Sequence, residues 1–396
     1  MQTVIQGFVQ KDFLPVAALL EKQLRAAGAG GAAVCVFHRG ERVVDIWAGS
    51  RSPSVDWESD TVVLSFSTTK GVMATMVHAL VDRGLLDYDD PVAKYWPEFA
   101  QGGKGSITVR QILSHQAGLY PIRSLIDHAD RMLDWDYMTN VLAAATPTCE
   151  PGKPGYHGIT YGWLVGELIR RVTKTSLKEA MQTLLIEPLA LDGVFLGAPD
   201  EARGRLAALI KPTFKPPTIW TRVAGWALLV VCKVLGLDPT VAKEALLPRG
   251  CRETFFSEGM LGAEVPAMNG VFTARSLARM YAMLAGGGVL EGKRFISEAT
   301  LHRATQVQSR RLDAVVGFPM RWRLGYHLVG TSRGILPHAF GHFGYGGSGA
   351  WADPDRNLSL AMTLNRVAGT PFGDMRMVRM GGVVAKCAEA RSKRAS

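Results

Sequence analysis

The chain has 396 residues, of which 47% are hydrophobic and 20% are charged. This composition supplies ample material for a folded core and excludes a mainly disordered chain. Lys and Arg outnumber Asp and Glu by 45 to 35, which gives a formal net charge of +10. The basic residues are scattered and no recognition motif accompanies them, so we do not expect nucleic acid as the partner.

The five cysteines are widely spaced and include no C-x-x-C pair, which argues against a disulfide framework and a structural zinc site. The first residues lack the basic stretch, apolar stretch and cleavage site of a secretory signal peptide. No group of His, Asp or Glu has the spacing of metal ligands, so we expect neither a metal nor another cofactor. These features favour a cytoplasmic protein.

The first part of the chain carries both helix and strand signals. Apolar residues recur at helical spacing over residues 13–27. Two β-rich runs, 33–37 and 42–48, flank a His-Arg-Gly-Glu turn and predict a hairpin. A short apolar run, 61–66, leads into a predicted helix over 67–84.

The middle of the chain is predicted to be mostly helical, and strand signals return after residue 317. The predicted elements are helices at 108–114, 161–172 and 276–284, strands at 325–329, 350–352 and 358–365, and a final amphipathic stretch at 373–390. Because strands cluster at both ends, we predict an α+β fold in which both termini build one domain. The boundaries are 1–66 plus 300–396 for the sheet domain and 67–299 for a mainly helical inserted domain.

One segment stands out by composition. Residues 223–231 are apolar throughout, and neighbouring residues such as Trp220 extend the run to 220–237. The run is interrupted before it reaches the roughly 20 residues that span a bilayer. It is interpreted as a buried helix, as a substrate-pocket cap within 211–250, or as a peripheral membrane contact through 220–237.

Ser67 and Lys70 form the first motif that carries chemistry. Their i, i+3 spacing at the start of a predicted helix puts the hydroxyl and the amine on one face. A serine hydroxyl becomes a nucleophile when a base takes its proton, and a neutral lysine can do so. The helix N-terminus disfavours a charged Lys70 and presents the Ser67 N–H to an oxyanion. The alternative is a capping serine beside a solvated lysine.

Two loops add to this pair. Tyr156 lies in a Pro/Gly-rich loop, 151–158, where a phenol can share a proton with Lys70 and relay it to a leaving group. A packed structural tyrosine is the alternative. The segment 341–349 holds five glycines before a predicted strand, so its backbone must approach something closely. A ligand along that edge, with the Tyr345 N–H as a second oxyanion donor, competes with a plain tight turn.

Together these motifs resemble the serine β-lactamase and penicillin-binding-protein superfamily, and most closely the class C β-lactamase-like esterases called family VIII carboxylesterases. The resemblance spans nearly the whole chain and includes residues 107–119 and 161–166. It implies a β-lactamase/transpeptidase-like fold with an antiparallel sheet flanked by helices. It also implies that Ser67 is the acylated nucleophile, Lys70 its base and Tyr156 the partner acid and base.

The resemblance also has two departures. The family's Y-x-N is Tyr156-His157-Gly158 here, which removes an amide that would bind a β-lactam side chain. The K-T-G lysine is His342, which removes a permanent cation. Both losses favour a neutral ester or lactone over a β-lactam or peptide. His342 also has a structural interpretation, as a residue that positions the strand.

We therefore predict a serine carboxylesterase that cleaves small-molecule esters, including lipophilic esters and lactones, through an acyl-Ser67 intermediate. The oxyanion is expected between the N–H groups of Ser67 and Tyr345. Substrate contacts are expected from four further residues: His342, Gly344, Gly346 and Trp226. The alternatives are a β-lactamase or D-amino-acid peptidase, an acyltransferase, and a non-hydrolytic ligand-binding pseudoenzyme. An α/β-hydrolase is set aside because residues 346–350 only approach G-x-S-x-G and no βαβ series precedes them.

Overall fold

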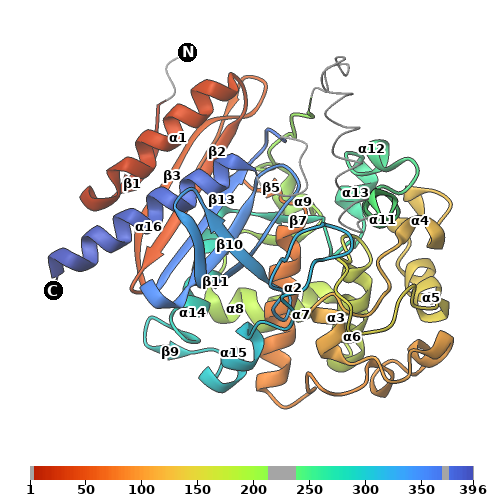
Figure 1. Cartoon of the computed structure of the whole chain (residues 1–396). Coiled ribbons are helices and arrows are strands. Elements are labelled where there is room, and N and C mark those ends of the chain that lie inside the picture. The colour runs from red at the N-terminus through yellow and green to blue at the C-terminus, as the bar shows by residue number, and fades with distance from the viewer. Residues whose placement is uncertain (1–3, 213–237, 368–373, 396) are drawn as a thin grey trace.

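An antiparallel sheet joins the two ends of the chain in the computed structural model, which describes residues 4–212, 238–367 and 374–395 (Figure 1). Its strand order is β1-β3-β2-β13-β12-β11-β10, with β4 paired to β3. The strands are β1 (Gln6–Val9), β2 (Gly31–His38), β3 (Glu41–Ser52), β4 (Val55–Asp56), β10 (His327–Thr331), β11 (Gly334–Phe343), β12 (Gly349–Asp353) and β13 (Leu358–Leu364). The N-terminal hairpin joins the C-terminal strands where β2 pairs with β13, with Cys35 opposite Ala361.

The turn between β2 and β3 is the predicted hairpin turn. Arg39 and Gly40 both have positive φ, at 55° and 76°, and His38 pairs with Glu41 across them. Two central residues with positive φ define a type I′ turn, whose twist matches that of the flanking strands. Glycine at the second position adopts this conformation without steric cost.

Helices cover both faces of the sheet. The terminal helices α1 (Leu14–Ala27) and α16 (Met375–Ala395) pack on one face, side by side in Figure 1. The helix α14 (Ala274–Ala285) packs on the other face against β2, β12 and β13. The apolar periodicity of 13–27 is explained by this packing, because Val16 and Leu20 are fully buried against the sheet.

The helix α2 (Thr68–Asp82) runs through the centre of the helical half and packs against α6 (Tyr161–Thr173) and β11. All of its residues except the last are buried. The α-helices around it are α3 (Val109–Leu113), α4 (Ile122–Leu125), α5 (Trp135–Ala144), α7 (Leu177–Met181), α8 (Glu187–Leu189), α9 (Asp200–Arg203), α11 (Pro239–Leu246), α12 (Cys251–Thr254), α13 (Glu258–Gly262) and α15 (Glu298–Thr305). A small sheet has the strand order β5 (Val63–Leu64), β7 (Gly270–Phe272), β6 (Val194–Leu196), and β5 leads into α2 along the chain. A further pair is formed by β8 (Val289–Leu290) and β9 (Lys293–Arg294).

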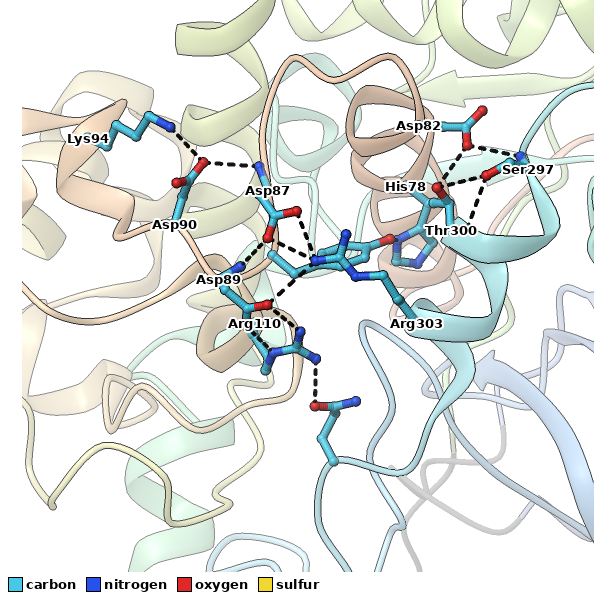
Figure 2. Close-up of polar contacts among 12 residues, drawn as sticks. His78, Asp82, Asp87, Asp89, Asp90, Lys94, Arg110, Ser297, Thr300 and Arg303 are labelled. Atoms are coloured by element: carbon cyan, nitrogen blue, oxygen red, sulfur yellow. Dashed lines mark hydrogen bonds and ion pairs between the residues drawn. The ribbon is translucent and has the colours of Figure 1, made fainter.

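A polar network fixes the far end of α2 (Figure 2). The Asp82 carboxylate accepts hydrogen bonds from the Ser297 N–H at 3.0 Å and the Thr300 hydroxyl at 2.8 Å, which ties α2 to the start of α15. From the same helix, the Arg303 guanidinium donates to Asp87 at 2.9 Å in the loop that follows α2. Side-chain hydrogen bonds therefore fix the C-terminal end of α2. The N-terminal end of the same helix carries residues of the candidate site described below.

The predicted helices and strands correspond to elements of the structure, but the sequence does not predict the short strands β1, β6 and β7. The long strand β11 was not predicted, because Pro337 and Gly341 interrupt its apolar pattern. The domain boundaries stay a prediction, and α14, from the predicted helical part, packs on the sheet. Among the helices in the described residues, none is both long enough and apolar enough to cross a membrane.

Candidate active site

Ser67 lies at the tip of a sharp turn between β5 and α2. The residue before it, Phe66, has a φ of 47°, a left-handed conformation that a bulky side chain rarely adopts. Its buried ring packs edge-on against Tyr345 at 5.5 Å and against Phe256 at 6.1 Å between centroids. This packing holds the strained turn in place, as is common at functional sites. The turn places the Ser67 hydroxyl at the start of α2.

The Lys70 amine lies one turn further along α2 and is fully buried. Its Nζ is 2.9 Å from Ser67 Oγ, 2.7 Å from the Gly158 carbonyl oxygen and 2.8 Å from the Ala267 carbonyl oxygen. Burial lowers the pKa of Lys70 well below its ordinary value, because desolvation penalises the charged ammonium. A neutral amine has two N–H groups for the two carbonyls and one lone pair, which remains for the proton of Ser67.

The Tyr156 phenol completes the group. Its Oη donates to Ser67 Oγ at 3.0 Å, and the Lys70 Nζ lies 5.2 Å from the centre of its ring. Burial raises the pKa of Tyr156 above its ordinary value, so the phenol stays protonated at neutral pH. Two side chains thus lie within hydrogen-bonding distance of the Ser67 hydroxyl: Lys70 from the same helix and Tyr156 from a loop 89 residues away in the sequence.

An apolar wall flanks the phenol on the side of Gly158. A Cβ on Gly158 would lie 2.1 Å from Leu246 Cδ2 and 3.2 Å from Tyr156 Cε1, so the Leu246 side chain fills the space beside Gly158. Leu246 is the last residue of α11, and it belongs to a cluster that includes Tyr120 and Trp322. Apolar side chains therefore stand where a side chain at position 158 would project.

The glycine-rich segment makes the close approach that its composition predicts. A Cβ on Gly344 would lie 2.1 Å from the Ser65 carbonyl oxygen, so the end of β11 lies directly against the strand that leads to Ser67. In the described parts of the chain, the N–H groups of Ser67 and Tyr345 have no hydrogen-bond acceptor. The Gly346 carbonyl faces away and accepts from Arg376 at 2.7 Å.

His342 lies deeper than a substrate contact would require. Its side chain is fully buried, its ring centroid is 6.2 Å from that of Tyr156, and its Nδ1 is 3.2 Å from the Phe343 carbonyl oxygen. Burial lowers the pKa of His342 well below its ordinary value, so the ring is neutral. This geometry favours the structural interpretation of His342. The remaining predicted substrate contact, Trp226, lies outside the described residues, as does segment 220–237.

Two further histidines support the loop of Tyr156. The backbone N–H of His157 donates to His115 Nδ1 at 3.1 Å, and the N–H of Leu119 donates to His157 Nε2 at 3.0 Å. Both rings are fully buried, and burial lowers the pKa of each, that of His157 to about 3. They hold the backbone and lie outside the reacting group.

Several contributors to the site carry no signal in the sequence. The Gly158 and Ala267 carbonyls act through the backbone, which every residue type shares. Leu246 is one of many apolar residues, and its role depends on the absence of a side chain at Gly158. Within residues 4–212, 238–367 and 374–395, no group of three or more His, Cys, Asp or Glu could hold a metal ion.

The chain belongs to the Beta-lactamase family, whose family model matches residues 16–381. It is 39% identical over 345 residues to "Esterase/beta-lactamase LipL" of Mycobacterium tuberculosis, which covers 85% of this chain and 77% of that protein. This match and the family model confirm the predicted family and show a hydrolase of the esterase/β-lactamase type.

Solved structures agree with this assignment. A family VIII carboxylesterase has a TM-score of 0.83 at 33% identity, covering 97% of this chain and all of that one. A penicillin-binding-protein homologue from Caulobacter crescentus has a TM-score of 0.83 at 35% identity, with the same coverage. These likenesses confirm the predicted β-lactamase/transpeptidase-like α+β fold and the predicted class, a β-lactamase-related serine carboxylesterase.

Proposed function

We propose that the protein hydrolyses carboxylic esters through a covalent acyl-Ser67 intermediate. The observation that carries the proposal is the convergence of Lys70 Nζ and Tyr156 Oη on Ser67 Oγ, at 2.9 and 3.0 Å. A base with a lowered pKa and an acid with a raised pKa on one hydroxyl is the arrangement that acyl transfer needs. The names of the similar proteins, which include esterase and carboxylesterase, support the same reaction class.

In the acylation step, Ser67 Oγ attacks the ester carbonyl carbon while its proton passes to the lone pair of Lys70. The C–O bond to the alcohol then breaks. The leaving oxygen takes the phenolic proton of Tyr156, and Tyr156 recovers a proton from the Lys70 ammonium. The products of this step are the acyl-enzyme and the free alcohol, and both protein groups return to their starting protonation states.

In the second step, a water molecule takes the place of the alcohol. Its proton passes to the Tyr156–Lys70 pair while its oxygen attacks the acyl carbon. The bond to Ser67 Oγ breaks, the serine regains its proton and the carboxylic acid leaves. The developing negative charge in both steps is assigned to the N–H groups of Ser67 and Tyr345, whose lack of an internal acceptor among the described residues supports this role.

The preferred substrate is a neutral ester with an apolar group beside Tyr156. The neutral His342 offers no cation to a substrate carboxylate, and the wall formed by Gly158 and Leu246 offers no amide. The cap and membrane interpretations of segment 220–237 remain predictions, as does Trp226 as a substrate contact. We expect short nitrophenyl esters to be turned over faster than nitrocefin, a β-lactam.

A labelling experiment tests the proposal. A fluorophosphonate should add one phosphonyl group to the wild type, detected by intact mass and mapped to Ser67. The Ser67→Ala variant should neither be labelled nor hydrolyse nitrophenyl esters, whereas the exposed-serine control Ser124→Ala should match the wild type. Labelling of another residue, or full activity of Ser67→Ala, would refute the mechanism. Faster acylation by nitrocefin than by esters would favour the β-lactamase alternative.

A further inference from the structure

Asp313 is a fully buried carboxylate that the reaction above does not use. It accepts four hydrogen bonds within the described structure. Its Oδ1 accepts from the backbone N–H of Tyr156 at 3.1 Å and from those of Val315 and Val316 at 2.9 Å each. Its Oδ2 accepts from the Trp322 indole N–H at 2.8 Å. One carboxylate thus contacts the backbone of the catalytic tyrosine and a neighbouring aromatic ring.

That aromatic ring supports the phenol directly. The Trp322 ring stacks on the Tyr156 ring with centroids 5.4 Å apart and an angle of 9° between the planes. The His115 ring also contacts the Trp322 ring, with centroids 4.2 Å apart. Trp322 is itself 1% exposed, so its position is set by packing and by its single indole hydrogen bond to Asp313.

Burying a carboxylate costs folding free energy, so a buried carboxylate that the reaction does not use is expected to have another role. Burial raises the pKa of Asp313, although the hydrogen bonds from the backbone and Trp322 oppose the rise. A loop anchor alone would need only the N–H groups of Val315 and Val316. The additional bond from the Tyr156 N–H fixes the backbone of that residue. The additional bond from the indole fixes the Trp322 ring on which the phenol stacks.

We propose that Asp313 and Trp322 are positioning residues that hold the Tyr156 phenol in register with Ser67 and Lys70. The proposal rests on the proposed esterase function. A displacement of about 1 Å at a reacting group is enough to cost roughly 100-fold in rate. Loss of either support is therefore expected to slow the chemical steps and leave substrate binding nearly unchanged.

A double-mutant cycle on nitrophenyl ester hydrolysis tests the proposal. In Asp313→Asn, an amide N–H can replace the Oδ2 acceptor and face the indole N–H, so the Trp322 contact is lost. We expect kcat to fall about 10- to 100-fold with KM within about 2-fold of the wild type. Trp322→Phe, which keeps a stacked ring but has no N–H, should show a smaller fall. In the Tyr156→Phe background, Asp313→Asn should cost less than about 2-fold, because the phenol it positions is already absent.

The matched control is Asp353→Asn, which changes another fully buried carboxylate that binds Arg356 at 2.6 Å. Its kcat should match the wild type even where its melting temperature falls. If Asp313→Asn lowers kcat by the same factor with and without the Tyr156 hydroxyl, or not at all, the positioning proposal is wrong. If instead the wild type does not hydrolyse esters, or Tyr156→Phe matches it, the proposed function fails first. Trp322→Phe decides the question if Asp313→Asn does not fold.

Discussion

The two faces of the main sheet are built on different principles. The face under α1 and α16 is packed with apolar side chains, among them Phe13, Val16, Leu20, Val34, Leu360, Met380 and Val384. The opposite face leads through α14 and β11 to α2, where the buried groups include an amine, a phenol and several imidazoles. These polar buried residues are His78, His115, His157, His327, His342, Lys70 and Tyr156.

The difference shows how one fold divides stability from function. On the terminal-helix face, stability comes mainly from apolar burial, which does not depend on pH. The exception is His38, whose pKa burial lowers to about 4. On the other face, desolvation keeps Lys70 neutral and Tyr156 protonated, and these are the states that acyl transfer requires. Burial of such groups costs stability that depends on pH. Changes on the two faces should therefore affect different measured quantities.

The largest expected effect is acid destabilisation by the five buried histidines on the functional face. Burial lowers the pKa of all five, to about 3 for His78 and His157 and to about 4 for His327. The unfolded chain binds these protons below the ordinary value of 6.5 and the folded chain does not, so stability falls as pH falls from 6.5 toward 4. The slope should approach about 7 kcal/mol per pH unit for five protons.

Urea unfolding at pH 7.5, 6.0 and 5.5 measures this slope. His78→Gln removes one of the five rings and should reduce the proton uptake on unfolding by about one. A free energy of unfolding that is flat between pH 7.5 and 5.5 would contradict the assignment of neutral buried imidazoles.

The second effect concerns Lys70. Lys70→Met should lower kcat/KM for a nitrophenyl ester at least about 1000-fold, because the base for Ser67 is lost. In the wild type, activity should rise with pH as Lys70 loses its proton at its lowered pKa. The wild type should also gain about 1.4 kcal/mol of stability per pH unit above that pKa and below the unfolded value of 10.5, since only the unfolded chain binds the proton.

Lys70→Met should lack this gain, which chemical unfolding at pH 8 and pH 9 of both proteins can measure. Equal gains in the two proteins would mean that Lys70 is charged in the folded state.

The third effect belongs to the apolar face. Leu20→Ala should cost about 2–5 kcal/mol of unfolding free energy, because it leaves a cavity between α1 and the sheet. The folded fraction should keep the wild-type kcat and KM, and the loss should be the same at pH 6 and pH 8. A change in kcat would show that this face is coupled to the site.

The smallest effect is expected at the surface of the same helix. Glu21 and Arg25 form an exposed i, i+4 ion pair at 2.5 Å on α1. Arg25→Ala should change the free energy of unfolding by only about 0.2–0.5 kcal/mol at low salt, and less at 0.5 M salt. A larger loss would show that this exposed ion pair contributes more to the free energy of unfolding than surface ion pairs ordinarily do.

The motifs in the chain predicted which three side chains would come together, while their roles in the reaction stay a proposal. Ser67, Lys70 and Tyr156 carry distinctive spacing or loop chemistry, and they do meet. The glycine-rich run before a strand predicts a close backbone approach, and Gly344 makes one. The exact function of His342 was less predictable, since its burial depends on packing from other elements.

The sequence by itself determined the family, the α+β class and the three side chains that converge at the candidate site, because local spacing and turn chemistry encode them. Tertiary structure alone decided the protonation states, the carbonyl partners of Lys70, the Leu246 wall and the Asp313–Trp322 support of Tyr156. The physical reason is that desolvation and hydrogen bonding depend on which atoms surround a group in space, and those atoms come from segments up to about 200 residues away along the chain.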